Sequence, residues 1–345
     1  MKGQCMKPGN IDFPIRLDIA RIPTPFQIMR RLSDQTGIEI FIKRDDLTGS
    51  ALSGNKIRKL EFALADAKAK GCDTVITCGG EQSNHCRATA VAATMTGMKT
   101  LLLLRTADPE NPPAPTGNLL MDKMSGADIL WITPDEYKQR AVIFEREAEK
   151  LRAAGRTPYI VPEGASYSVG AWGYIGAFAE LAEDIAMLSD SGAKPVTIIH
   201  ACGSGGTAAG LILGSLMMES NVRIISVNVC DDREYFVNAI GNICEDTIRE
   251  YNLKVDFDRS RHIEILDGYV GRGYALSRPD ELSRIIGLSR MEGIFLDPVY
   301  TGKAYHAMMT EIEKDKKAFG DRIVFIHTGG IFGLFPKSDE LAPLL

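Results

Sequence analysis

The chain lacks several features that would assign it quickly to a class of protein. Its seven cysteines include no C-x-x-C pair of the kind that zinc and redox sites use. No segment approaches the ~20 consecutive apolar residues that span a bilayer, and the N-terminal segment lacks the apolar run of a secretory signal. We therefore expect no metal, no membrane partner, and free thiols in a reducing cytoplasm.

An excess of one charge is also missing. The 40 Lys and Arg residues are balanced by 45 Asp and Glu residues, which gives no electrostatic footprint for a nucleic acid partner. Hydrophobic residues make up 45% and charged residues 25%, as in ordinary globular proteins. Because 345 residues exceed what one hydrophobic core usually sustains, we expect two domains.

Short apolar runs alternate with helix-like stretches from residue 38 onward. The runs are IEIFIKRDD, TVITCGG, KTLLLLR, ADILWIT, TPYIVPEG, VTIIHACG, RIISVNV and RIVFIHTGG. The expected helices cover 56–71, 85–97, 136–155, 173–188, 207–218, 233–251, 278–292 and 301–314. This rhythm predicts an α/β fold with mostly parallel sheets flanked by helices, and the Pro-rich segment 107–118 is expected to be a loop.

The first candidate for chemistry is SGNKIRKLEF at 53–62, where a small-residue turn leads into a helix. Lys56 and Lys59 lie close to one face of that helix. Cations at a helix N-terminus oppose the helix dipole, so these lysines and Arg58 suggest a bound anion. Ordinary solvated lysines are the alternative.

The second candidate is CGGEQSNHCR at 78–87, between a strand and a helix. Gln82, Ser83 and Asn84 fall where a helix N-terminus exposes unpaired N–H groups, which predicts a carboxylate cradle. Ser83 or Asn84 could instead only cap the helix, and the two interpretations are compatible.

The third candidate is ACGSGGTAAG at 201–210, which matches the dinucleotide pattern G-x-G-x-x-A. No acidic residue ends a strand about 20 residues further on, unless Asp231 or Asp232 serves. The hydroxyls of Ser204 and Thr207 suit a single phosphate instead. A nicotinamide-dependent oxidoreductase remains the alternative from a different class.

Two further motifs, LDPVYTGKAYH at 296–306 and FIHTGGIFG at 325–333, bring polar residues into the pattern, the second at a strand end. Tyr300 and His327 could equally be structural core residues. An amine, a phosphate site and a carboxylate cradle together suggest an enzyme that uses pyridoxal 5'-phosphate. A protein that holds this cofactor without turnover is a further alternative.

Five motifs in order, RDDLTGSALSGNKIRKLEF, EQSNH, GSGGTAAG, LDPVYTGKA and IHTGG, resemble the D-cysteine desulfhydrase and 1-aminocyclopropane-1-carboxylate deaminase family of pyridoxal-phosphate enzymes. The resemblance implies fold type II, similar to the tryptophan synthase β-subunit, and a homodimer. We expect a large domain of residues 1–56 and 166–345 and a small inserted domain of residues 57–165. The site would lie between them.

The resemblance also implies site residues. Lys56 should link covalently to the cofactor, Asn84 should bond its phenolic oxygen, and Gln82 and Ser83 should face the substrate carboxylate. Tyr300 and Tyr274 match active-site tyrosines, and Lys56, Ser83 or Tyr300 should move the Cα proton. The cofactor phosphate should contact Lys59, Gly203, Ser204, Gly205, Gly206 and Thr207.

Two positions bear on the reaction. The deaminases of the family carry glutamate and leucine where this chain has Thr301 and Thr328. A carboxylate near the pyridine nitrogen would keep it protonated, whereas a threonine leaves it largely neutral. β-Elimination manages with the weaker electron sink, so we expect a carbon–sulfur lyase acting on D-cysteine.

The alternatives within the family are an L-cysteate sulfo-lyase and an aminocyclopropane-carboxylate deaminase. A sulfonate substrate would need a cation, for which Arg105 and Arg272 are candidates. Glu81 and the segment 164–174 depart from the family pattern. Because of these departures, the resemblance does not assign the residues that form the pocket for the substrate side chain.

Overall fold

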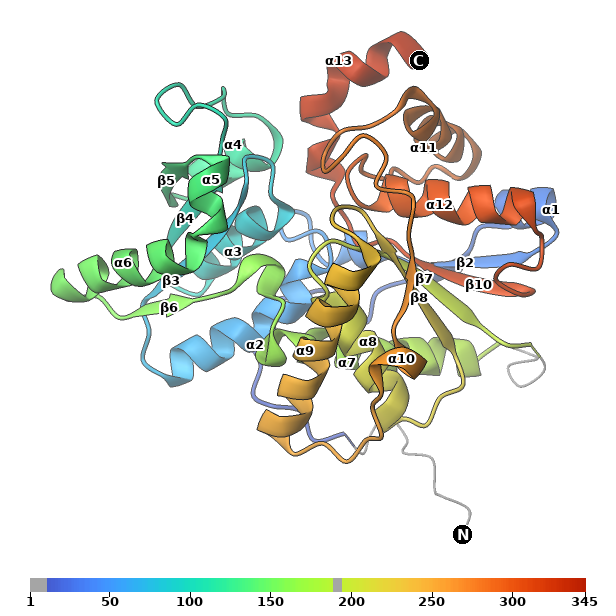
Figure 1. Ribbon diagram of the computed structural model, residues 1–345, viewed down its shortest axis with the longest axis horizontal. Coiled ribbons are helices and arrows are strands. Elements are labelled where there is room, and N and C mark those ends of the chain that lie inside the picture. The colour runs from blue at the N-terminus through green and yellow to red at the C-terminus, as the bar shows by residue number, and fades with distance from the viewer. Residues whose placement is uncertain (1–10, 189–193) are drawn as a thin grey trace.

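The computed structural model describes residues 11–188 and 194–345 and contains two sheets flanked by helices (Figure 1). The larger sheet has six strands in the order β1-β2-β10-β7-β8-β9 and the smaller has four in the order β5-β4-β3-β6. The strands of the larger sheet are β1 (Phe26–Ile28), β2 (Glu39–Lys43), β7 (Thr197–Cys202), β8 (Arg223–Asn228), β9 (Glu264–Leu266) and β10 (Arg322–Ile326). Those of the smaller are β3 (Thr74–Gly80), β4 (Lys99–Arg105), β5 (Asp128–Ile132) and β6 (Pro158–Ile160).

The pairing is parallel throughout the smaller sheet and in the larger one except between β1 and β2. The predicted α/β class with mostly parallel sheets is confirmed. The antiparallel edge strand β1 was not predicted, because its three residues form too short a pattern.

The helices cover both faces of the larger sheet, with α7 to α9 on one side and α1, α11 and α12 on the other (Figure 1). Their bounds are α1 (Arg30–Thr36), α2 (Lys56–Ala69), α3 (Asn84–Met95), α4 (Gly117–Met124), α5 (Pro134–Lys138), α6 (Arg140–Ala153), α7 (Ser168–Ala186), α8 (Gly206–Met217), α9 (Arg233–Tyr251), α10 (Arg259–His262), α11 (Pro279–Glu292), α12 (Thr301–Lys314) and α13 (Ser338–Leu341). Neighbouring strand residues point to opposite sides, so Ile198 packs with the first group and Ile199 with the second.

The boundaries differ from the sequence prediction in a few places. The single helix expected over 136–155 is two helices, since Gln139 leaves helical geometry at φ −101° and ψ 18°. Residues 107–116 contain no helix or strand, but α4 already begins at Gly117, inside the predicted loop. The helix expected over 173–188 starts five residues earlier, at Ser168, and residues 189–193 lie outside the described part of the chain.

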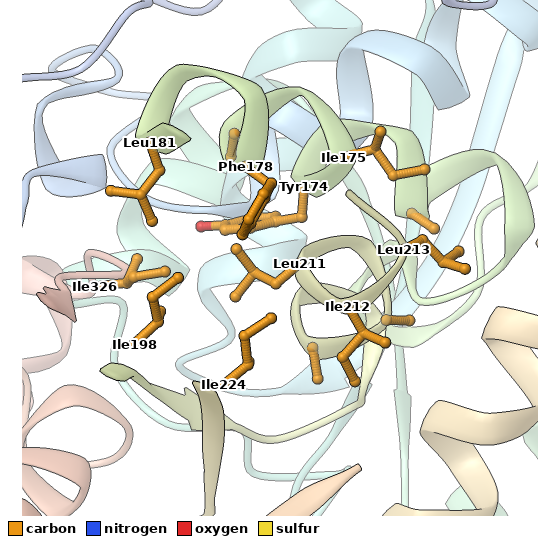
Figure 2. Packing of buried hydrophobic residues seen from close by; sticks show 14 of the residues in the cluster. Tyr174, Ile175, Phe178, Leu181, Ile198, Leu211, Ile212, Leu213, Ile224 and Ile326 are labelled. Carbon is orange, nitrogen blue, oxygen red and sulfur yellow. The ribbon is translucent and has the colours of Figure 1, made fainter. Parts of the chain in front are cut away.

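Helix α7 packs closely against α8, and Figure 2 shows the buried side chains of the two helices that meet there. A Cβ added at Gly210 would lie 2.4 Å from Tyr174 Cβ, and one at Gly214 would lie 2.6 Å from Phe178 Cβ. The glycines therefore let the two helices approach closely, with Leu211 and Ile212 filling the core beside them. The first half of helix α8 is thus held in place by its packing against α7 at Gly210 and Gly214.

The strand ends of both sheets lead into the motifs singled out above. Strand β3 ends at Gly80, opposite the last residue of β4, and β7 and β10 end at Cys202 and Ile326. Ligands in open α/β sheets bind at such carboxyl ends. The smaller sheet lies within residues 74–160, while the predicted division at 56/57 and 165/166 stays a prediction. In the described residues, no helix is long and apolar enough to cross a membrane.

Candidate active site

A cavity with about 730 Å³ of empty space, part of it open to solvent, lies where the strand ends of the two sheets meet. Its walls come from the loops after β3, β7 and β10, the end of β4 and the start of α2. The predicted site residues that line it are Lys56, Ser83, Asn84, Gly203, Ser204, Gly205, Thr207, Tyr274, Tyr300 and Thr328. Motifs far apart in sequence therefore meet in one place.

Lys56 begins α2, and its amine donates to Asn55 Oδ1 at 2.8 Å. Asn55 is itself fixed, because its amide donates to Thr207 Oγ1 at 3.0 Å. Burial lowers the pKa of Lys56 to about 8, with Asp297 opposing this shift and Arg87 adding to it. About a tenth of the amine is therefore neutral at pH 7, far more than for an ordinary lysine, and the neutral form is the one that attacks an aldehyde.

Lys59 lies one helical turn behind Lys56 and is 1% exposed. Its Nζ lies 3.4 Å from Ser166 Oγ, which also contacts Ser204 Oγ at 2.8 Å and accepts from the Gly206 N–H at 3.2 Å. Burial, reinforced by Lys56, holds the pKa of Lys59 well below its ordinary value. Such an amine suits a bound anion, because the anion would supply the missing countercharge.

The loop before α8 is suited to approach by a phosphate. Gly205 has φ +86° and carries no side chain that could cap the helix, so apart from the Gly206 N–H, which donates to Ser166 Oγ, the first turn can offer its N–H groups to a ligand. A Cβ at Gly203 would lie 2.9 Å from Tyr300 Cε1, and one at Gly206 would lie 2.7 Å from Ser166 Oγ. The backbone itself therefore forms this wall of the cavity.

The loop after β3 carries Ser83 and Asn84, two of the residues predicted to form a carboxylate cradle. Ser83 caps α3, with its Oγ accepting from the Cys86 N–H at 3.2 Å, and it also lines the cavity. Asn84 Oδ1 accepts from Asn118 Nδ2 at 3.0 Å, which leaves the Asn84 NH₂ group for a ligand. The helix cap is therefore present at Ser83, while the carboxylate cradle stays a prediction.

Gln82 does not reach the cavity wall. Its Nε2 donates to the Thr116 carbonyl at 3.1 Å, and its Oε1 accepts from the Asn118 N–H at 3.0 Å. The side chain thus fixes the start of α4 and does not line the cavity, while its predicted contact with a substrate carboxylate stays a prediction. The sequence did not reveal this, because α4 itself was not predicted.

Tyr300 and Tyr274 form a buried pair whose hydroxyl oxygens lie 2.6 Å apart. Burial raises the pKa of Tyr274 to about 12 and that of Tyr300 well above its ordinary value, so both keep their protons. The Lys56 amine lies 5.9 Å from the centre of the Tyr300 ring. A proton donor and an amine therefore face the same space.

One side chain holds the loop that carries Tyr274. The Lys303 ammonium, on α12, donates to the carbonyls of Gly273 at 3.0 Å and Leu276 at 2.9 Å, and also to that of Val270. Lys303 is fully buried. The loop position is therefore set from α12, the helix that follows Tyr300.

Thr301 and Thr328 are not equivalent in the structure. Thr328 lines the cavity, whereas Thr301 is fully buried and its hydroxyl donates to Asp297 Oδ1 at 2.6 Å. The Thr301 hydroxyl is therefore used within its own turn and does not line the cavity, and its expected cofactor contact stays a prediction. Asp297 also accepts from the N–H groups of Val299, Tyr300 and Thr301.

Asp297, Asn55, Ser166 and Glu163 were missed in the sequence. Asp297 begins the D-P-V-Y motif and Asn55 precedes Lys56, so their motifs carried a signal that was not used. Ser166 lies in the segment that departs from the family pattern. Of the two candidate arginines, Arg105 lines the cavity and Arg272 is exposed outside it, while Glu81 is partly exposed.

Two mostly parallel sheets that share one cavity between their strand ends are the architecture of pyridoxal-phosphate enzymes of fold type II. The donor groups fit that cofactor, since they offer an amine for its aldehyde, a buried cation and helix start for its phosphate, and an amide for its phenolic oxygen. No cluster of three or more His, Cys, Asp or Glu that could hold a metal occurs in the described residues.

The chain matches the family model described as "Pyridoxal-phosphate dependent enzyme" over residues 17–329 and belongs to this family. It is 40% identical over 332 residues to the Arabidopsis thaliana "Bifunctional D-cysteine desulfhydrase/1-aminocyclopropane-1-carboxylate deaminase, mitochondrial", covering 95% of this chain and 81% of that one. The chain is thus a pyridoxal-phosphate-dependent lyase of the deaminase and desulfhydrase group, and the nicotinamide alternative is set aside.

Solved structures with the same fold are also found. An "ACC deaminase homologue" superposes with a TM-score of 0.85 at 35% identity, covering 96% of this chain and 97% of that one. A fungal L-serine ammonia-lyase from Rhizomucor miehei gives a TM-score of 0.65 at 15% identity, covering 95% of this chain and 99% of that one. The second likeness shows the fold alone.

Proposed function

We propose that this enzyme eliminates sulfide from D-cysteine, giving pyruvate, ammonia and hydrogen sulfide. The observation that carries this proposal is the chemistry at the end of β10, where the cavity wall is Thr328 and no carboxylate from positions 301 or 328 is present. The only carboxylate among the residues that line the cavity, Glu163, is paired with Arg140 at 3.4 Å. A largely neutral pyridine nitrogen favours loss of a good leaving group over cleavage of a carbon–carbon bond.

When bound, the cofactor supplies the electron sink that acidifies the substrate Cα–H bond. Lys56, whose pKa is about 8, is the proposed base for this proton in its neutral form. Tyr300 keeps its own proton and is the proposed donor toward the departing group, with Tyr274 fixing its hydroxyl. Ser83 and Asn84 at the start of α3 are proposed to hold the substrate carboxylate.

The remaining assigned roles are also proposals. Lys59 is proposed to balance the phosphate charge from behind the wall, through Ser166. The phosphate itself would contact the loop of Gly203, Ser204, Gly205, Gly206 and Thr207. We propose these residues as the phosphate site because they line the cavity or lie directly behind it.

A substrate series tests the reaction. Release of a 2-oxo acid and ammonia is measured with D-cysteine, L-cysteine, L-cysteate and 1-aminocyclopropane-1-carboxylate. The highest kcat/KM is expected with D-cysteine, accompanied by sulfide. A higher value with the cyclopropane would replace the proposal by the deaminase, which the name of the Arabidopsis relative also includes. A higher value with L-cysteate would replace it by the sulfo-lyase.

We further propose a homodimer in the cytoplasm. Cys72, Cys78, Cys86, Cys202, Cys230 and Cys244 are free thiols, as a reducing compartment allows. Light scattering during gel filtration should give twice the chain mass of 37.7 kDa. A mass of one chain would refute the dimer.

A further inference from the structure

Arg105 ends β4 at the rim of the cavity, opposite Gly80 in the strand pairing. Its guanidinium lies 4.8 Å from the centre of the Tyr137 ring and 5.7 Å from the centre of the Tyr274 ring. Contacts with two ring faces hold a guanidinium in place while its N–H donors point elsewhere. Arg105 is therefore oriented within the cavity wall without using its hydrogen-bonding capacity.

Arg105 also has no countercharge. Over residues 11–188 and 194–345, no carboxylate forms an ion pair with it and its side chain donates no hydrogen bond, in contrast to the nearby Arg140, which pairs with Glu163. The other cations of the site are needed for the cofactor, Lys56 for the covalent link and Lys59 for the phosphate. Arg105 is thus the cation left for a second negative group, on the substrate.

We infer that Arg105 binds the β-substituent of the substrate and selects amino acids in which this group is an anion or departs as one. A thiol, which departs as hydrosulfide, and a sulfonate, which is already an anion, are such groups, and a guanidinium can bind a sulfonate through two parallel hydrogen bonds. This inference rests on the proposed function and deepens it. A cyclopropane ring has no departing anion and gains nothing from Arg105.

The Cα proton passes to the base, and the pair of electrons from the Cα–H bond forms the Cα=Cβ bond. The Cβ–S bond breaks with its two electrons on sulfur, which leaves as hydrosulfide from cysteine or as sulfite from cysteate. A fixed positive charge at the point where negative charge develops lowers the barrier, because no reorganisation is needed.

Binding without turnover tests the selectivity directly. The cofactor-loaded enzyme is titrated in a calorimeter with 3-sulfopropanoate and with 3-hydroxypropanoate, which lack the amine and cannot react. The sulfonate is expected to bind about 10-fold to 100-fold more tightly, as charge-assisted hydrogen bonds imply. Arg105→Gln should abolish this difference and Arg105→Lys should restore part of it, since lysine keeps the charge and loses the fork.

Arg272→Gln is the matched control, because Arg272 is exposed outside the cavity. It should leave both affinities unchanged. Equal binding of the two probes by the natural enzyme, or a preference that survives in Arg105→Gln with its cofactor band intact, would overturn the inference.

Turnover gives the second readout. Arg105→Gln should lower kcat/KM for D-cysteine by about 10²-fold to 10³-fold, the range seen when one group that stabilises developing charge is removed. Turnover of D-cysteine that is independent of Arg105 refutes the inference and leaves the proposed function intact. Absent turnover of D-cysteine with an Arg105-dependent preference for the sulfonate probe refutes the proposed function alone.

Discussion

The two sides of the cavity, one proposed to bind the cofactor phosphate and the other the substrate, are built in different ways. On the phosphate side, Lys59, Ser166 and Gly206 are linked by hydrogen bonds, and α8 is clamped against α7 at Gly210. On the substrate side, the Arg105 guanidinium lies over the ring of Tyr274. Arg105 is at the end of strand β4, and Tyr274 is in a loop. The proposed phosphate contacts are therefore held by packed helices, whereas the proposed substrate contacts come from a few side chains that can change without disturbing the core.

Replacing Lys56 should have the largest effect, because it removes both the covalent link and the proposed base. Lys56→Ala is expected to lower kcat by at least about 10³-fold. Borohydride treatment followed by peptide mapping should label Lys56 in the natural enzyme. Lys68→Ala, at the exposed far end of α2, is the control and should keep full activity. A labelled peptide elsewhere would contradict the assignment.

Tyr300→Phe tests the substrate side separately from the cofactor side. Loss of one positioned proton donor should reduce kcat by about 10²-fold to 10⁴-fold. The visible band of the cofactor should not change, because the phosphate contacts are untouched. Tyr235→Phe, on the exposed side of α9, should behave as the natural enzyme. Unchanged kcat in Tyr300→Phe would remove this tyrosine from the mechanism.

Gly206→Ala tests the phosphate side. The added Cβ would lie 2.7 Å from Ser166 Oγ and 2.9 Å from Ser166 Cα, which forces the backbone of the loop to move. Cofactor affinity, measured by equilibrium dialysis, should fall about 10-fold to 100-fold, as strain of 1–3 kcal/mol implies. Gly287→Ala, on α11 with open space around it, is the matched control. Equal affinities would show that this loop is less constrained than its contacts indicate.

The pH dependence of cofactor attachment should show the smallest effect. The neutral amine of Lys56 is the reactive form, so the attachment rate of cofactor-free enzyme should rise with pH, about tenfold per unit, and level off above about 8. Glu163 contributes a negative charge that raises this pKa. Stopped-flow measurement of Glu163→Gln should therefore place the inflection at lower pH, and a shift to higher pH would contradict this electrostatic account.

The sequence predicted the elements better than the side-chain directions. The bounds of β3, β4, α9 and α12 follow from apolar runs and periodicity that the local residues already contain. The parallel sheet then brings the strand-end motifs together, so ten of the predicted site residues line one cavity. This part of the site follows from the topology alone.

The directions of the remaining site side chains depend on contacts between residues that lie far apart in the sequence. Gln82 was predicted to face the substrate, but its bonds to Thr116 and Asn118 depend on α4, which the sequence pattern did not reveal. Which of Arg105 and Arg272 faces the cavity likewise depends on a distant contact, because Arg105 packs against the ring of Tyr137. Tyr137 lies on α5, which the sequence analysis expected to be continuous with α6. Spacing within one motif carries no information about such partners.

The three bonds from Lys303 to the loop of residues 270–276 have an evolutionary consequence. They end on main-chain carbonyls, so they hold the loop whatever side chains it carries. Mutations at Tyr274 and its neighbours can therefore accumulate without loosening the frame of the loop. We expect related enzymes with different substrates to diverge first in this segment, and libraries confined to it to yield folded variants with altered selectivity.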